Sequence, residues 1–207
     1  MTERDTDHGD DGTPAEETRK RPRPGERRVQ ILQTLATMLE SPGSERVTTA
    51  ALAARIGVSE AALYRHFASK AQMFEGLLDF IEQAIFSLAQ QLQDREPDGR
   101  ARSRKLVGLL LQFGEKNPGM ARVMVGDALV HENERLQQRM ALFFDKVEST
   151  LKHNLRNESS ATPTVDAQAQ ASVLTSFCVG RLQRFARSGF KRAPTEHLDA
   201  SLAQLLP

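Results

Sequence analysis

The sequence predicts an all-α protein in which a small N-terminal helical domain precedes a larger helical core. Three observations support this fold class. Apolar residues recur every three or four positions along most of the chain, which is the period of helices that bury one face. No segment shows the alternation of a half-buried strand, and no internal repeat is present. Clusters of Pro, Gly and Asn divide the chain into segments of helical length.

The composition is that of an ordinary soluble globular protein. Of the 207 residues, 39% are apolar and 27% are charged, and the longest apolar runs are too short to cross a bilayer. The N-terminus lacks the basic-then-apolar pattern of a secretory signal, and a single cysteine cannot form an internal disulfide. We therefore expect a cytoplasmic protein without a membrane partner.

Residues 1–23 are predicted to be a disordered charged tail, because they contain almost nothing that could be buried. Seven acidic residues and one arginine lie between Met1 and Glu17, whereas Arg19 to Arg28 carries six bases and one acid. A basic run beside a folded domain suits DNA phosphates, but a solvated leader explains it equally well.

Helical periodicity and breakers place the helices in order. The first is expected from about Pro24 to Leu39, where the breaker cluster Ser41 to Ser44 ends it. Ser69 and Gln72 form a predicted capping box at the start of a long helix. Asn117-Pro118-Gly119 ends a later helix, and a short segment to about Gly126 follows. The helices after the first are expected at about 48–56 and 59–66, from 69 to about 92, from about 106 to 117, from about 136 to 155, and at 164–187 and 195–206.

The stretch 48–67 has the spacing of a helix-turn-helix within a domain that spans 24–70. Ala53 is small enough for two helices to cross closely, and Gly57 can take a positive φ in the three-residue turn. Ser59 then caps the second helix and leaves its N-terminal amides directed outward. The alternative is a plain helical hairpin. The polar, aromatic and basic groups of 64–70 favour DNA contact instead.

At this point the sequence resembles the TetR family of DNA-binding proteins. Its hallmark is L-Y-R-H-F at 63–67, followed by S-K at 69–70. F-I-E at 80–82 and F-G-E-K-N-P-G at 113–119 make the chain similar to the nucleoid occlusion factors of that family, from about Arg27 to Lys191. The resemblance implies a TetR-like fold and a nucleoid-associated homodimer that binds specific sites on double-stranded DNA. It further implies capture of the C-terminal tail of the division protein FtsZ, which inhibits septum assembly over the nucleoid, and it leaves open whether dimers form higher-order assemblies on DNA.

The resemblance also implies site residues. The DNA-binding positions are Thr48, Thr49, Ser59, Ala61, Tyr64, Arg65 and Lys70. The tail-binding positions are Phe80, Leu109, Lys116 and Asn117. Leu88 and Gln112 depart from the family pattern, which has a basic residue and a glycine there. From periodicity alone, Leu109 and Phe113 are expected in the core, whereas Phe80 lies at the edge of its stripe and suits a surface anchor.

Residues 71–207 are predicted to form the core that binds the partner and dimerises. The helix at 164–187 carries two apolar stripes, so it must be covered on two sides. We expect this helix and the last one to form a four-helix interface with a second subunit. The predicted interface residues are Ala171, Val173, Phe177 and Gly180.

Enzymatic and metal sites are not predicted. No P-loop, dinucleotide fingerprint or nucleophile elbow occurs, so we expect neither an enzyme nor a cofactor. The run His131 to Glu134 lacks a second histidine at helical spacing and is interpreted as a solvated helix start. Cys178 lies in an apolar stripe and is expected to be an inert buried thiol. The alternative function is a transcriptional repressor with a small-molecule effector pocket, although the low aromatic content disfavours such a pocket.

Overall fold

The computed structural model describes residues 25–41, 47–156 and 164–206, and all regular structure in these ranges is helical, as predicted. The predicted N-terminal tail and the loop at 157–163 lie outside the described residues. The elements are α1 (Glu26–Leu39), α2 (Thr49–Ile56), α3 (Glu60–Tyr64), α4 (Lys70–Arg95), α5 (Gly99–Lys116), α6 (Pro118–Met124), the 3₁₀ helix η1 (Asp127–Leu129), α7 (Glu134–Arg156), α8 (Thr164–Arg187) and α9 (Leu198–Leu205).

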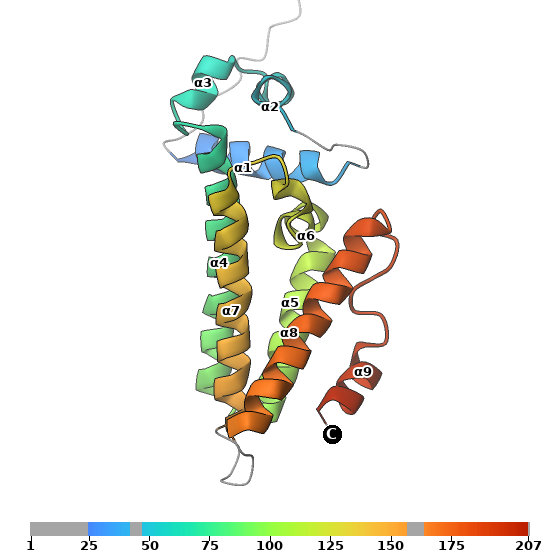
Figure 1. Ribbon diagram of the computed structural model, residues 1–207. Helices are drawn as coiled ribbons and strands as arrows, with labels where there is room; N and C mark the ends of the chain where they lie inside the picture. The colour runs from blue at the N-terminus through green and yellow to red at the C-terminus, as the bar shows by residue number, and fades with distance from the viewer. Residues whose placement is uncertain (1–24, 42–46, 157–163, 207) are drawn as a thin grey trace, which may run out of the picture.

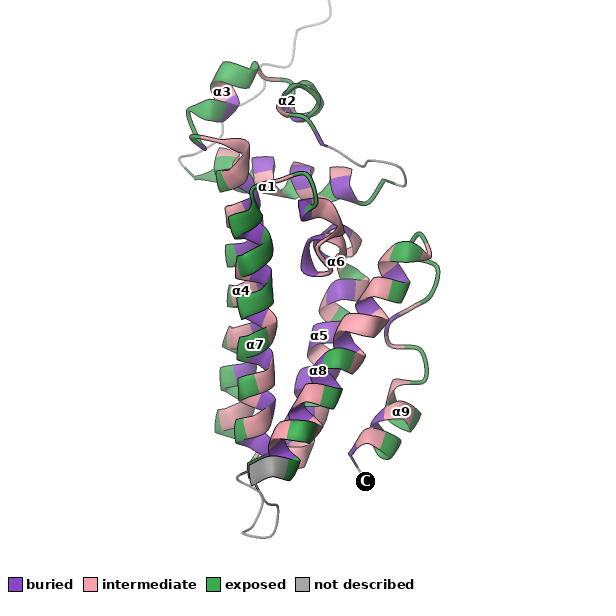
Figure 2. Ribbon diagram, in the orientation of Figure 1, coloured by how far each residue is buried: buried purple, intermediate pink, exposed green. Residues whose placement is uncertain are grey.

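The helices form an N-terminal cap, made of α1, α2 and α3, and a two-layered body, made of the helices that follow (Figure 1). Helix α1 lies across one end of the body, with α2 and α3 above it. Helices α7 and α8 lie in front of α4 and α5, and α9 lies beside α5 and α8. Their buried faces turn inward and form one continuous hydrophobic core from α1 to α9 (Figure 2). Within the described ranges, no helix combines the length and the apolar composition needed to cross a bilayer.

Local signals in the helix-turn-helix act as the sequence predicts. The Thr48 hydroxyl caps α2 by accepting a hydrogen bond from the amide of Ala51 at 3.1 Å. Gly57 ends α2 in the left-handed conformation, at φ 77° and ψ 40°. Ser59 caps α3 by accepting from the amide of Ala62 at 3.3 Å. The direction of the outward end of α3 is therefore set by local chemistry.

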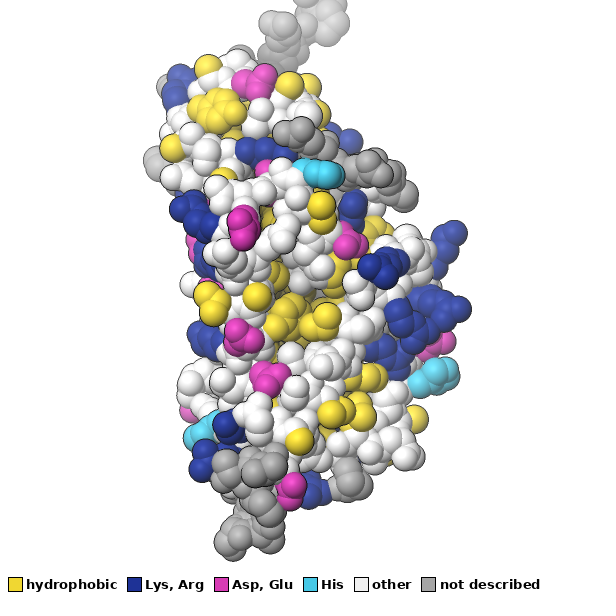
Figure 3. All heavy atoms as spheres, in the orientation of Figure 1, with side chains coloured by type: hydrophobic (Ala, Val, Ile, Leu, Met, Phe, Trp, Pro, Cys, Tyr) yellow, Lys and Arg dark blue, Asp and Glu magenta, His cyan; other side chains and the backbone are white. Residues whose placement is uncertain are grey.

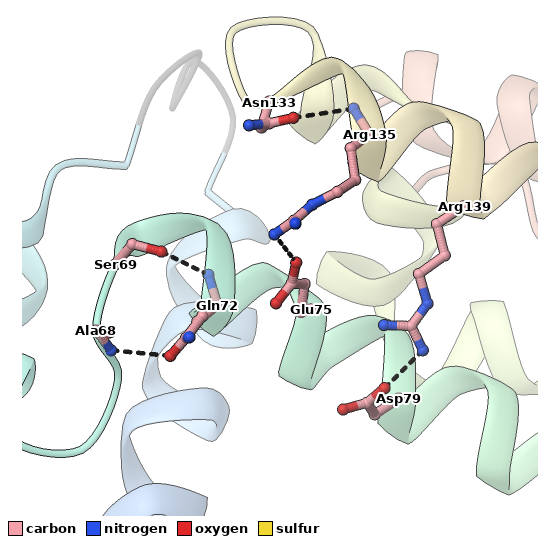
Figure 4. Close-up of polar contacts among 8 residues, drawn as sticks. All are labelled: Ala68, Ser69, Gln72, Glu75, Asp79, Asn133, Arg135 and Arg139. Carbon is pink, nitrogen blue, oxygen red and sulfur yellow. Dashed lines mark hydrogen bonds and ion pairs between the residues drawn. The ribbon is translucent and has the colours of Figure 1, made fainter.

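The start of α4 differs slightly from the predicted capping box (Figure 4). The Ser69 hydroxyl accepts a hydrogen bond from the Gln72 amide at 3.2 Å, as predicted. The Gln72 side chain, however, accepts from the amide of Ala68 at 2.9 Å and not from that of Ser69. These two hydrogen bonds thus hold Ala68, the residue before the N-cap Ser69, as well as the first turn of α4.

The structure moves the starts of α1 and α9 from the sequence expectation and gives the bounds of the short helical segment after residue 117. Helix α1 begins at Glu26, after Gly25 at φ 91°, and Pro24 lies outside the described residues. The stretch after residue 117 is a helix of its own, α6, with Pro118 in its first turn, where a missing N–H costs nothing. The last helix starts at Leu198 because His197 takes a positive φ of 52°.

Helix α6 attaches the cap to the body. A Cβ atom at Gly119 would lie 2.0 Å from the carbonyl oxygen of Ala36 in α1, so only glycine permits this approach. Three residues further on, the Arg122 guanidinium donates a hydrogen bond to the carbonyl of Leu39 at 3.2 Å. The end of α1 is therefore held directly against the core.

Ion pairs between α4 and α7 brace the long helix that leaves the cap. Arg139 of α7 donates to Glu82 at 2.9 Å. It also pairs with Asp79 at 2.5 Å, as Figure 4 shows. Arg135 pairs with Glu75 one turn nearer the cap. The hydrogen bonds from Arg139, chiefly to Glu82, raise the pKa of its guanidinium above the usual value. These ion pairs join α7 to the stretch of α4 that carries Phe80.

Candidate functional site

The outward face of α3 presents four of the predicted DNA-binding residues to solvent. Ser59, Ala61, Tyr64 and Arg65 are all exposed, and Tyr64 has 45% of its surface accessible. Leu63, on the opposite side of the helix, is fully buried and fixes α3 to the rest of the domain. The phenol, the guanidinium and the small side chain thus lie on one accessible surface, which suits a DNA groove.

The two predicted threonines differ in their surroundings. Thr48 is exposed, although its hydroxyl already serves as the cap of α2. Thr49 is half-buried, and its hydroxyl donates to the carboxylate of Glu60 at 2.6 Å. That bond ties α2 to α3 and uses the hydroxyl proton that a phosphate oxygen would need. The hydroxyl of Thr49 therefore serves a structural role within the helix-turn-helix.

Lys70 lies between the cap and the core. Its ammonium group pairs with the carboxylate of Glu132 and lies 5.6 Å from the centre of the Phe74 ring. Only 21% of the Lys70 side chain and 9% of the Glu132 side chain are exposed. The expectation that Glu132 belongs to a solvated helix start is wrong, because this carboxylate neutralises a lysine contributed by a distant helix.

Arg28 is a positioning residue that sequence analysis grouped with the basic tail. Its guanidinium donates to the carbonyl of His66 at 2.6 Å and lies 4.0 Å from the centre of the Phe67 ring. It therefore stabilises the exit from α3. These residues are 38 positions apart, so no local pattern could have paired them.

The predicted partner site begins at the cap end of α4 and α5. Phe80 is 50% exposed, and its ring centre lies 6.2 Å from that of Phe113. Lys116 is exposed in the last turn of α5. Asn117 is half-buried and donates its side-chain amide to the carbonyl of Phe113 at 2.8 Å. An exposed phenylalanine, backed by a partly buried one and beside a lysine, can hold an apolar, acidic peptide.

A hollow of about 570 Å³ lies further along the same two helices, where α9 covers them. Leu109 lines it, together with both residues that depart from the family pattern, Leu88 and Gln112. Phe80, Lys116 and Asn117 do not. The full lining is Leu88, Gln91, Leu92, Arg95, Arg104, Lys105, Gly108, Leu109, Gln112, Leu198, Asp199 and Leu202. Leu109 is half-buried and is therefore not an ordinary core residue.

Sequence analysis missed the α9 wall and the basic residues of this hollow. Arg104 donates a hydrogen bond to the carbonyl of Leu206. Lys105 pairs with Glu96 at 2.6 Å, and this hydrogen bond lowers the pKa of the Glu96 carboxyl. The only available signal was the amphipathic pattern of the last helix, which does not say where that helix packs.

The outer face of α8 supplies the candidate dimer surface. Val173 is 50% exposed, Phe177 is partly buried, and the Gly180 Cβ position meets open space. Ala171, in contrast, is fully buried within its own protomer. The second apolar stripe, with Ala171, packs inside the subunit, so a contact with another subunit is left to Val173, Phe177 and Gly180.

Other features of α8 are a buried thiol and a basic edge. Cys178 is fully buried, as predicted, and burial raises its pKa to about 12. Lys and Arg side chains gather where the C-terminal half of α8 leads towards α9 (Figure 3). The bases of this stretch are Arg181, Arg184, Arg187, Lys191 and Arg192. Sequence analysis did not single out this stretch.

Family models and solved structures similar to this chain agree with its fold. The model of the bacterial regulatory proteins of the tetR family matches residues 31–77, and that of the SlmA-like, tetracyclin repressor-like C-terminal domain matches residues 98–206. The fatty acid degradation regulator FadR from Bacillus halodurans superposes with a TM-score of 0.74 at 14% identity, over 88% of this chain and 95% of its own. The TetR regulator PfmR from Thermus thermophilus gives 0.67 at 20% identity, over 86% and 94%. The chain is thus a DNA-binding regulator of the TetR class and not an enzyme.

Curated relatives narrow the class. The nucleoid occlusion factor SlmA of Shewanella sediminis is 51% identical over 84% of this chain and 89% of its own length. That of Idiomarina loihiensis is 48% identical over 84% and 90%. The chain therefore belongs to the SlmA family of nucleoid occlusion factors.

Proposed function

We propose that the protein binds specific sites on the nucleoid as a cytoplasmic homodimer, captures the C-terminal tail of FtsZ, and thereby inhibits septum assembly over DNA. The observation that carries this function is the half-exposed Phe80, ten residues along α4 from the end of the DNA-binding domain, whose ring lies beside that of the partly buried Phe113. A half-exposed phenylalanine backed by a second ring is an apolar anchor for a short peptide.

The DNA-facing surface and the peptide groove share α4. About ten residues of helix, roughly 15 Å, separate Lys70 from Phe80. Ion pairs to Arg135 and Arg139 brace this length. DNA binding that fixes the position of the start of α4 is therefore expected to raise peptide affinity by a coupling free energy of about 1 to 3 kcal/mol, and the peptide must tighten DNA binding by the same factor.

The dimer accounts for the exposed stripe of α8. Val173 and Phe177 are apolar, and Gly180 allows close approach of another helix. In a homodimer the same stripe meets its own copy across a two-fold axis, and the two DNA-binding domains then face successive turns of the duplex.

The test is binding of a labelled FtsZ tail peptide to operator-bound protein, measured by fluorescence anisotropy with and without DNA. Phe80→Ala is expected to weaken binding at all salt concentrations, because ring burial is not screened. Lys116→Glu is expected to weaken it mainly at low salt. Leu142→Ala, a change of another exposed apolar residue, on α7, is the matched control. Undiminished binding by both groove variants, with DNA affinity intact, would place the groove elsewhere.

A transcriptional regulator with a small-molecule effector is the second candidate. The hollow between α4, α5 and α9, at about 570 Å³, has the size of a ligand site. Such a regulator would release its operator on binding the effector and would not retain the peptide. The peptide assay therefore separates the two functions.

A further inference from the structure

The peptide groove continues beyond Leu109 towards α9. Leu88 of α4 is 40% exposed, and it lines the hollow together with Leu109. Leu198 and Leu202 of α9 line the same hollow. Phe80 and Leu88 come from α4, and Phe113 and Leu109 from α5, so the exposed Phe80 and the hollow follow the same pair of helices. An extended chain anchored at Phe80 would meet further leucines there.

The far end of this hollow is positively charged. Arg95, Arg104 and Lys105 line it, against a single carboxylate, Asp199. Lys105 is paired with Glu96, and Arg104 donates to a backbone carbonyl. Arg95 is exposed in the last turn of α4, with no ion-pair partner among the residues that the structure describes. The hollow therefore has an apolar floor and an incompletely neutralised basic end.

We infer that this end binds a carboxylate of the captured tail, so that Arg95, Arg104 and α9 form part of the partner site; this rests on the proposed function. The leucine floor favours an acidic peptide with apolar side chains over DNA, which has no apolar side chains to bury. Phe80 and Arg95 are fifteen residues apart on α4, or roughly 22 Å. An extended chain advances about 3.3 Å per residue. The bound carboxylate therefore lies about seven residues from the side chain that packs on Phe80.

The experiment measures affinity of the FtsZ tail peptide for DNA-bound protein at low and high salt. Arg95→Glu is expected to weaken binding about threefold or more at low salt, since it reverses an exposed charge at the site. Asp199→Asn is expected to tighten binding, because it removes the single opposing carboxylate. Arg156→Glu, at the exposed end of α7, is the control for net charge and leaves affinity within about twofold of the wild type.

A charge exchange completes the test. Each acidic residue of the peptide is replaced in turn by lysine, and the acid that lies about seven residues from the apolar anchor should be the one whose replacement restores binding to Arg95→Glu. If Phe80→Ala abolishes binding while Arg95→Glu and Asp199→Asn leave it unchanged at low salt, the peptide binds at Phe80 as proposed. The inference that its carboxylate binds at Arg95 is then wrong. If the wild type does not bind the peptide at all, both the proposed function and this extension of it are overturned.

Discussion

Lys70, the first residue of α4, forms an ion pair with Glu132, which lies between η1 and α7. The two residues are 62 positions apart, and both side chains are largely buried. This pair ties the end of the DNA-binding domain to the core. The Lys70 ammonium group has three N–H donors, and the hydrogen bond to Glu132 uses one of them. Only the others can be donated to a phosphate.

Lys70→Ala and Glu132→Gln should have different effects. If Lys70 contacts phosphate, its removal weakens binding about equally on all DNA sequences and lowers the salt slope by roughly one per subunit. Glu132→Gln keeps the ammonium group and should preserve that slope, but it should lower the free energy of unfolding by about 1 to 2 kcal/mol, because a partly buried charge loses its partner. Fluorescence anisotropy across a salt series measures the slope, and urea unfolding at fixed protein concentration measures the free energy of unfolding. A slope unchanged by Lys70→Ala would leave this lysine only its structural role.

Ala61 and Tyr64 should affect DNA binding in distinct ways. Both are exposed on the outward face of α3, but only the tyrosine has a hydroxyl for phosphate and a ring for sugar or a thymine methyl. Tyr64→Ala should weaken binding to every sequence, whereas Ala61→Gln should change the order of preference among operator variants. Competition binding with a panel of single-base operator variants is the measurement. An unchanged order of preference for Ala61→Gln would exclude that position from base contact.

Val173→Glu should shift the protein from dimer to monomer. The side chain is half exposed on the apolar stripe of α8, and a carboxylate buried there without a partner opposes association. Sedimentation velocity at micromolar concentration without DNA is the measurement. Leu142→Glu introduces the same charge on the exposed face of α7 and should leave the dimer intact. A monomeric wild type would contradict the proposed interface.

Gly119→Ala should destabilise the fold strongly. Its Cβ would lie 2.0 Å from the Ala36 carbonyl oxygen, and backbone in α1 cannot yield as a flexible side chain can. We expect a loss of about 2 kcal/mol or more. Gly108→Ala is the control within α5, because its Cβ would meet only Leu198 at 3.8 Å. It should be neutral or stabilise by up to about 1 kcal/mol. Urea unfolding should therefore show a large loss of unfolding free energy for Gly119→Ala and none for Gly108→Ala, and a Gly119→Ala variant as stable as the wild type would contradict the close approach.

Cys178 should resist alkylation in the native state. Burial raises its pKa to about 12, and only the thiolate reacts. Because the folded pKa is raised above the unfolded value of about 8.5, this group contributes stability that is complete below pH 8.5 and lost as the pH rises towards 12. Iodoacetamide should therefore label the protein in urea but not in native buffer at pH 8. Rapid native labelling would show that the α8 core opens readily.

The local features of the cap follow from sequence alone. The positive φ of Gly57 and the caps made by Ser59 and Ser69 depend on side chains within three residues of the backbone that they serve. The two stripes of α8 were likewise visible as a period in the sequence. Interactions over such short distances need no knowledge of the rest of the fold, so the all-α class and most helix bounds could be predicted.

Tertiary structure decided which of the predicted site residues remain free to contact DNA or another protein. Lys70 meets Glu132, Arg28 meets His66, and Ala171 turns into its own subunit, all through contacts between segments far apart in the chain. The hollow at Leu109 exists only because α9 returns to cover α4 and α5. Periodicity identifies the apolar face of a helix but not the helix that covers it, because pairing depends on how all the helices fill one core. The sequence by itself thus determined the DNA-binding motif and its class, whereas packing decided the shape and charge of the hollow between α4, α5 and α9.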